Sequence, residues 1–182
     1  MEQRIFIAIP WDDNLRANIG RHLSKYQKAR RPGRRWLPDK YWHITVLQPQ
    51  PWGEQTIQKA IDILKDSLAV HRFILRTGQI IPAPPNQPPR MVWCRFQMHN
   101  QFFLLQKQIF KILGDHGIGF SHKQRTREII HTTLARCQPG TLIEFNYITC
   151  GYQLAVDCVE IWRSKLCKSG AEYETLGRIS LK

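Results

Sequence analysis

A short pattern, His-x-Thr followed by an aliphatic residue, occurs twice in this chain, at 43–46 and at 131–134. Alternate side chains of a β-strand share one face, so we expect His43 and Thr45 to point the same way. His131 and Thr133 would do so in the second copy. If the two strands meet at a cleft, two imidazoles and two hydroxyls converge on a volume about the size of a phosphate.

These side chains suit acid-base chemistry on a phosphodiester. Because the unperturbed pKa of histidine is about 6.5, one imidazole can be neutral and accept a proton while the other is protonated and donates one. General acid-base catalysis of this kind contributes on the order of 10²–10⁴-fold per group. The threonine hydroxyls can hydrogen-bond the phosphoryl oxygens whose charge grows in the transition state. The pattern therefore predicts paired proton transfer by His43 and His131.

A metal site built on the two histidines is the alternative chemistry. Neither motif has a carboxylate or thiol at ligand spacing beside it, and zinc sites normally use three or four protein ligands. Acid-base catalysis therefore ranks above metal binding, and we expect no cofactor and no metal. The remaining histidines have no comparable partner and are interpreted as helix, loop or surface residues: His22, His71, His99, His116 and His122.

The charge balance is the unusual part of the composition. Lys and Arg number 27 against 14 Asp and Glu, a formal net charge of +13, which predicts polyanionic partners and RNA above all. An arginine-rich turn at 30–35 could hold phosphates. Trp36 is a candidate to stack on a terminal base, because the guanidinium of Arg35 beside an indole can hold phosphate and base together. A solvated basic turn and core packing of the tryptophan are the alternatives.

The rest of the composition is that of a globular protein. The apolar share of 42% and the charged share of 23% are ordinary. Five scattered cysteines without a C-x-x-C pair fit a reducing compartment. No segment approaches the roughly 20 apolar residues of a membrane span, and the first apolar run is too short for a secretory signal. We expect a soluble cytoplasmic protein, a monomer with no membrane association and no obligatory protein partner.

Hydrophobic periodicity predicts the same order of elements twice. Strands are expected at 4–9, 42–47, 73–81, 91–97, 156–162 and 173–181 and in the second motif, and helices from Asp12 or Asp13, at 54–69 and at 101–113. The prolines of 48–53 and 82–89 predict loops, and 114–127 and 168–170 are expected to be a loop and a turn. Hairpins combined with separate helices favour an α+β fold rather than a doubly wound parallel one.

These residues together resemble the 2H phosphoesterase superfamily. They are most similar to the RNA 2',3'-cyclic phosphodiesterases, historically called bacterial 2'-5' RNA ligases. Beyond the two motifs, the resemblance lies in Arg4-Ile5-Phe6-Ile7-Ala8-Ile9, Arg35-Trp36, Pro89-Arg90-Met91-Val92-Trp93, Thr133-Leu134-Ala135-Arg136 and Ile161-Trp162-Arg163-Ser164. It therefore covers nearly the whole chain.

The resemblance implies a bilobal α+β domain over 1–182, with two interleaved antiparallel lobes and one motif from each facing a central cleft. It implies hydrolysis of RNA 2',3'-cyclic phosphate ends to 2'-phosphates, with reversible 2'-5' ligation as a second activity. It assigns Arg136 a substrate contact. Arg136 is five residues from His131, however, so a regular strand would point it away from the motif face, and a β-bulge or a strand end is required between them.

The sequence also departs from the family pattern. Val46 replaces the commoner leucine, and 48–53 stands where an aromatic-Leu-Gly step is expected, which bears on substrate preference rather than on reaction type. A non-catalytic RNA-binding module would have the same composition. Relatives acting on small cyclic nucleotides, ADP-ribose cyclic phosphates or 2'-5' oligoadenylates provide a third interpretation. We favour His43 as base and His131 as acid, an assignment on which the repeated pattern is nearly silent.

Overall fold

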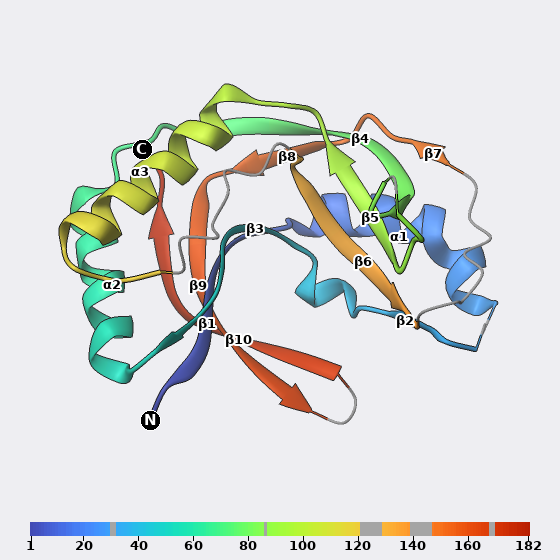
Figure 1. Cartoon of the computed structure of the whole chain (residues 1–182). Coiled ribbons are helices and arrows are strands. Elements are labelled where there is room, and N and C mark those ends of the chain that lie inside the picture. The colour runs from blue at the N-terminus through green and yellow to red at the C-terminus, as the bar shows by residue number, and fades with distance from the viewer. Residues whose placement is uncertain (30–31, 86, 121–128, 139–146, 168–169) are drawn as a thin grey trace.

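The computed structural model describes residues 1–29, 32–85, 87–120, 129–138, 147–167 and 170–182. Its elements lie in two antiparallel sheets and three helices within these ranges (Figure 1). In chain order they are β1 (Gln3–Pro10), α1 (Asp13–Lys28), β2 (Arg34–Trp36), a 3-10 turn η1 (Asp39–Tyr41), β3 (His43–Trp52), α2 (Glu54–Ser67), β4 (Phe73–Ala83), β5 (Met91–Phe96), α3 (Asn100–Asp115), β6 (His131–Cys137), β7 (Ile148–Thr149), β8 (Gln153–Val156), β9 (Cys158–Cys167) and β10 (Gly170–Ser180).

Each sheet contains one of the two motif strands. The four-stranded sheet has the order β10-β9-β1-β3, and the six-stranded sheet has the order β2-β6-β5-β4-β7 with β8 also paired to β4. In Figure 1, α2 and α3 lie on the side of the smaller sheet and α1 on the side of the larger one. The expected α+β fold with antiparallel sheets is confirmed, as is the repeated order of strand, helix and motif strand.

The first helix forms where its sequence predicts. The Asp12 side chain accepts a hydrogen bond of 2.7 Å from the backbone N–H of Leu15 and so caps the first turn. Lys25 and Lys28 lie in the last turn, where positive charge favours the helix dipole. Leu15, Ile19 and Leu23 are buried along one face, so this helix is held mainly by its apolar stripe.

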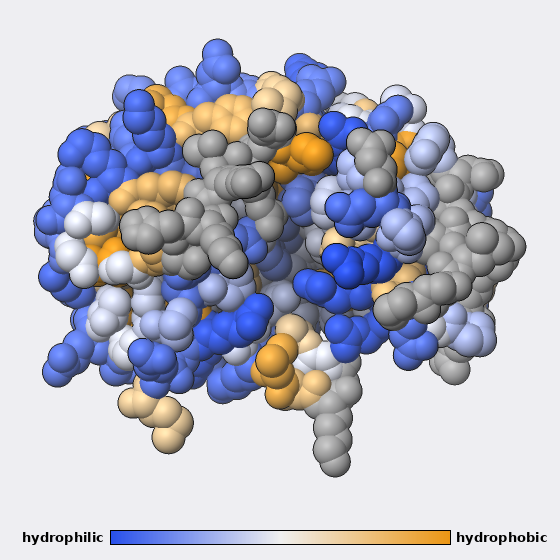
Figure 2. Space-filling model, in the orientation of Figure 1, coloured by the Kyte–Doolittle hydropathy of each residue, from blue (hydrophilic) through white to orange (hydrophobic). Residues whose placement is uncertain are grey.

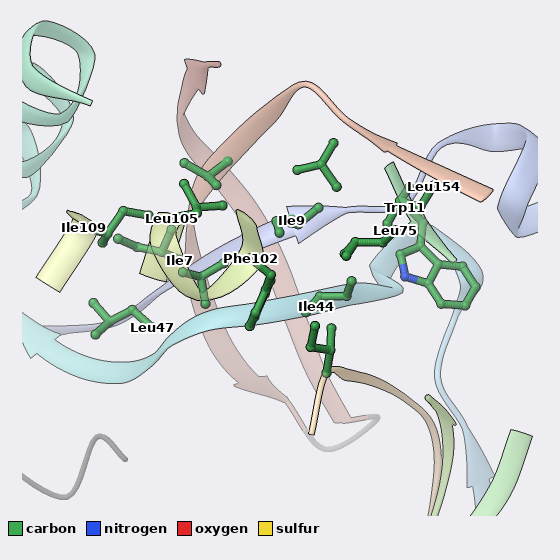
Figure 3. Packing of buried hydrophobic residues seen from close by; sticks show 14 of the residues in the cluster. Ile7, Ile9, Trp11, Ile44, Leu47, Leu75, Phe102, Leu105, Ile109 and Leu154 are labelled. Carbon is green, nitrogen blue, oxygen red and sulfur yellow. The ribbon is translucent and has the colours of Figure 1, made fainter. Parts of the chain in front are cut away.

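One hydrophobic cluster connects the two sheets. It includes Ile7 of β1, Ile44 of β3, Leu75 of β4 and Leu154 of β8, with Phe102 of α3 packed among them (Figure 3). The core therefore runs through both lobes, and the motif strands are anchored in it by their inward-facing residues. None of the helices in the described ranges is both long and apolar enough to cross a membrane.

The expected end of the first motif strand at Leu47 is wrong, because β3 continues through the prolines to Trp52. β3 is an edge strand with β1 beside it, and prolines are tolerated at a sheet edge because the missing N–H would face outward. Arg4 pairs with Pro51 and Gln3 with Trp52. The segment interpreted as a loop is thus a strand.

Three other strand boundaries also differ from the expectation. β4 extends through Pro82 to Ala83, where β5 is beside it but β7 reaches only Gln79 and Ile80. The single strand expected at 156–162 is two, since Asp157 separates β8 from β9. The short strand β2 lies within and just after the predicted arginine-rich turn. Of that turn, Arg30 and Arg31 lie outside the described residues. So do residues 121–127 of the loop expected at 114–127 and residues 168–169 of the turn expected at 168–170.

Candidate active site

The two motifs line a single cleft of about 960 Å³. In Figure 2 the middle of the displayed face is recessed and bordered mainly by hydrophilic residues. Residues from both sheets contribute to the cleft: Arg4, Phe6, Arg35, Leu37, His43, Thr45, Gln48, Pro49, Met91, Trp93, Ile129, His131, Thr133, Arg136, Ser164, Leu166, Cys167, Gly170, Ala171 and Tyr173. The histidines and threonines expected to share a pocket therefore do so.

Strand alternation directs these side chains as expected. The intervening residues of both motifs are buried, with Ile44 and Thr132 each 1% exposed and Leu134 fully enclosed. The motif strands also touch each other, because the Thr132 hydroxyl donates a hydrogen bond of 2.7 Å to the backbone carbonyl of His43. The first and second motifs are thus neighbours, although they belong to different sheets.

Both catalytic candidates are held by the same backbone contact. The Nδ1 atom of His43 lies 2.7 Å from the carbonyl oxygen of Tyr41, and that of His131 lies 3.2 Å from the carbonyl oxygen of Ile129. A carbonyl oxygen only accepts, so Nδ1 carries the hydrogen in each contact. On each ring, Nε2 is the nitrogen that does not take part in this backbone contact.

The aromatic surroundings of the two imidazoles differ. The ring of His131 stacks on the indole of Trp93, with 3.8 Å between centroids and 22° between planes. The ring of His43 makes tilted or edge contacts with Phe6, Trp162 and Tyr173 at 5.0–5.4 Å. The pair is therefore similar in backbone geometry but not in environment.

Of the bulge and the strand end that were the alternatives before Arg136, β6 has the bulge. Ala135 pairs with Val92 of β5 while Thr133 pairs with Trp93, the next residue along, so Leu134 is the extra residue of the bulged strand. Leu134 and Ala135 are consecutively buried. The alternation then resumes with Arg136 on the face of His131 and Thr133, and Arg136 lines the cleft.

Arg35 lies directly opposite Arg136, because β2 pairs with β6 in that register. Like charges facing each other across a strand pair are destabilising unless an anion lies between them. Both arginines also line a second cavity of about 410 Å³, together with Gly33, Arg34, Cys137 and Gln138. Neither cavity has an aspartate or glutamate among its described lining residues, so both are suited to anions.

Trp36 does not line the cleft with its neighbour Arg35. It pairs with the buried Ala135 and packs, half-buried, against the hydrophobic core. Successive side chains of a strand point to opposite faces, so the arginine and the tryptophan cannot serve one ligand together. This position agrees with the core-packing interpretation of Trp36, and its stacking on a base stays a prediction.

Four of the remaining histidines lie in the described ranges, and none of the four lines the cleft. His22 contacts the hydroxyl of Tyr152 at 2.8 Å, His99 stacks on Phe73, and Nδ1 of His116 contacts the Ile112 carbonyl. His71 is exposed, and His122 lies outside the described residues. Within the described ranges, no three His, Cys, Asp or Glu side chains are grouped so as to hold a metal ion.

Several lining residues were not singled out by sequence. Phe6 and Trp93 lie in segments that carry the family resemblance, but only the pairing of β1 and β5 with the motif strands places them at the histidines. Tyr173 comes from the last strand. Burial raises the pKa of its hydroxyl, and the nearby guanidinium groups of Arg136, Arg4 and Arg35 oppose the shift. Tyr173 therefore stays protonated at neutral pH and can donate a hydrogen bond.

No protein-family model and no curated protein sequence matches the chain. Solved structures do match it over nearly the whole length. TT0787 of Thermus thermophilus superposes with a TM-score of 0.81 at 20% identity and 97% coverage of both chains. E. coli LigT in the apo form gives 0.75 at 18% identity, covering 100% of this chain and 98% of LigT.

A structure described as a phosphoesterase gives a TM-score of 0.73 at 18% identity, with 100% of this chain and 99% of that one covered. LigT complexed with 3'-AMP gives 0.76 at 20% identity and the same coverage. The chain therefore has the fold of TT0787, of LigT and of this phosphoesterase.

Proposed function

We propose that this protein is a 2H phosphoesterase, a single domain over 1–182, that hydrolyses RNA 2',3'-cyclic phosphate ends to 2'-phosphates. The main support for this proposal is that two His-x-Thr pairs from different sheets line one cleft. Nδ1 of each histidine contacts a backbone carbonyl. We assign proton transfer to Nε2, the other nitrogen of each ring. The likeness to a phosphoesterase and to LigT supports the same reaction class.

The proposed reaction is an in-line displacement at the cyclic phosphorus. His43 accepts a proton from water through Nε2 as the water oxygen bonds to phosphorus. His131 donates its Nε2 proton to the 3'-oxygen as the bond from phosphorus to that oxygen breaks. The product has a 2'-phosphate and a 3'-hydroxyl. Thr45 and Thr133 hydrogen-bond the non-bridging oxygens as their charge grows.

The different surroundings of the histidines support this division of roles. An indole face attracts a cation by about 0.5–2 kcal/mol, so the stack of Trp93 on His131 favours the imidazolium that a general acid needs. Phe6, Trp162 and Tyr173 contact the ring of His43 in tilted or edge geometry instead. His43 is therefore the base for hydrolysis, and the roles exchange in the reverse, ligating direction.

The arginines support RNA as the substrate. Arg35 and Arg136 face each other at the cleft, and an RNA phosphate between them would relieve their repulsion. Their second cavity offers room for a further phosphate of the same strand. LigT structures contain 3'-AMP or ATP, which agrees with a nucleotide ligand. We also propose that the protein is cytoplasmic, because its five free cysteines suit a reducing compartment. The monomeric state stays a prediction.

The test is an assay in EDTA with an oligoribonucleotide that ends in a 2',3'-cyclic phosphate, followed by mapping of the product terminus. We expect a 2'-phosphate, undiminished by the chelator. His43→Ala and His131→Ala should each lower kcat by on the order of 10²–10⁴-fold. His71→Ala, a change at an exposed histidine, is the matched control. A 3'-phosphate product, or dependence on added metal, contradicts the proposal.

A non-catalytic RNA-binding module is the second candidate, favoured by the charge of +13. It predicts RNA binding without turnover, and His43→Ala would then leave every measured property of the complex nearly unchanged. Small cyclic nucleotides are the third. They would be indicated by turnover of 2',3'-cyclic mononucleotides as fast as that of oligoribonucleotides.

A further inference from the structure

The first motif strand has a bulge at the same place as the second. In β3, Leu47 pairs with Ile7 of β1 while Thr45 pairs with Ala8, so Val46 is the extra residue. Val46 and Leu47 are consecutively buried, as Leu134 and Ala135 are in β6. The residue that follows returns to the motif face in both strands. In β6 it is Arg136, and in β3 it is Gln48.

Gln48 accordingly lines the cleft with His43 and Thr45. Its backbone is held by Gln50, which is 4% exposed and whose side-chain amide donates hydrogen bonds of 3.0 Å to the carbonyls of Gln48 and Pro49. A second irregularity in the register lies here, between Leu47 and Gln50. Segment 48–53, which departs from the family pattern, is therefore held by the Gln50 hydrogen bonds in a conformation that places Gln48 at the cleft.

Gln48 and Arg136 occupy matching places but differ in chemistry. A guanidinium is a fixed cation with donors only, and it suits phosphate. A glutamine amide is uncharged and offers a donor and an acceptor side by side, the combination that pairs with the edge of a nucleobase. The facing arginines Arg35 and Arg136 lie on the larger sheet. On the β1–β3 side, the cleft is lined by Arg4 near the start of β1 and by the neutral pair Gln48 and Pro49.

We propose that Gln48 is a specificity-determining residue that hydrogen-bonds the edge of the terminal nucleobase, across the reacting phosphate from Arg136. This inference rests on the proposed function. It predicts that the two sides of the cleft bind different parts of the RNA. The larger sheet holds backbone phosphates, and the smaller sheet contacts the base. Single-stranded RNA is commonly recognised through such exposed base edges.

The experiment measures kcat/KM on oligoribonucleotides that end in a 2',3'-cyclic phosphate and differ only in the last base. Wild type should prefer one terminal base. Gln48→Ala and Gln48→Met, the latter of similar length but without hydrogen bonds, should lower kcat/KM on that base by about 5- to 100-fold. On the substrate that ends in the least favoured base, the same variants should change kcat/KM by less than about threefold. Gln55→Ala on α2, an exposed glutamine, should leave the profile unchanged.

The outcomes separate this inference from the function on which it rests. If wild type hydrolyses none of the oligonucleotides, the phosphodiesterase proposal fails and the role of Gln48 fails with it. If wild type is active but has no preference for a terminal base, only the role of Gln48 is overturned. The same holds if both Gln48 variants keep the wild-type order of kcat/KM among the four bases and the wild-type differences between them. Thermal unfolding of each variant checks that it is folded, and the two substitutions provide independent readings.

Discussion

The hydroxyl of Thr132 joins the two motif strands by donating a hydrogen bond to the backbone carbonyl of His43, 89 positions away in the sequence. β3 is the edge strand of its sheet, and this contact gives the carbonyl a partner from the other sheet. The hydroxyl oxygen in turn accepts a hydrogen bond of 2.9 Å from the indole N–H of Trp11. The buried Thr132 thus links the two motif strands that form the two sides of the cleft.

Replacing Thr132 by valine should harm both stability and catalysis. The change keeps the shape but leaves the Trp11 N–H and the His43 carbonyl without this partner, and each buried unsatisfied group costs about 1–3 kcal/mol. We expect a lower free energy of unfolding in urea. Because a small displacement of a catalytic group is costly, kcat should fall on the order of 10-fold or more with KM little changed.

Thr132→Ser is the matched control, because it retains the hydroxyl. It should restore most of kcat even if the missing methyl group lowers stability. Equal kcat values for the serine and valine variants would show that the hydrogen bond does not position His43.

Gly170 controls the place of Arg35. Gly170 begins β10 with a φ of 129°, and a Cβ added there would overlap Nη1 of Arg35. Gly170→Ala should therefore push the guanidinium out of position and raise KM for the oligoribonucleotide by about 3- to 10-fold, the value of one charge-assisted contact at a partly exposed site.

A double-mutant cycle tests this coupling. In an Arg35→Ala background, Gly170→Ala should have almost no further effect on KM. Gly151→Ala is the control, since a Cβ at Gly151 meets nothing within 4 Å. Additive effects of the two substitutions would mean that the strain at Gly170 acts through the backbone rather than through Arg35.

Arg136→Ala should weaken RNA binding in a salt-dependent manner. Each phosphate contact on single-stranded nucleic acid contributes about 0.7 to the slope of log affinity against log salt concentration. Binding of a non-hydrolysable oligoribonucleotide to the variant should therefore have a slope smaller by about 0.7. An unchanged slope would indicate that Arg136 does not contact a phosphate.

Tyr173→Phe should lower kcat/KM by the same factor at every pH between about 6 and 9. The folded protein raises the pKa of this hydroxyl, chiefly through burial, above an ordinary value of about 10. The group stays protonated throughout that range, so the substitution removes a neutral donor and no titrating charge. A loss that grows toward the alkaline end of the profile would contradict this.

The sequence was informative where the argument depended on local geometry. The alternation of His43 with Thr45 and the burial of the intervening residues follow from the pleat of a strand and needed no partner. The family resemblance placed Arg136 at the site, and the same alternation then required a bulge or a strand end before it. The N-cap at Asp12 and the apolar stripe of α1 are local in the same way.

What sequence reasoning missed depended on partners far along the chain. The extension of β3 through Pro49 and Pro51 requires an edge position, which only the sheet order reveals. The packing of Trp36 against the core depends on the register of β2 on β6. The bulge in β3 could have been considered on the same alternation of side chains as the bulge in β6. The prolines after Leu47 predicted a loop instead, and Gln48 was therefore not identified.

Trp93 offers a test of which histidine is the acid. Its indole stacks on His131 at 3.8 Å, and a face-on aromatic partner favours a cation by about 0.5–2 kcal/mol. Trp93→Leu removes that preference, so the general acid should lose its proton at a lower pH. We expect the alkaline limb of the kcat profile to shift toward lower pH by about 0.4–1.4 units, since one pH unit corresponds to about 1.4 kcal/mol. Trp93→Phe, which keeps an aromatic face, should shift it less. A shift of the acidic limb instead would make His131 the base and His43 the acid.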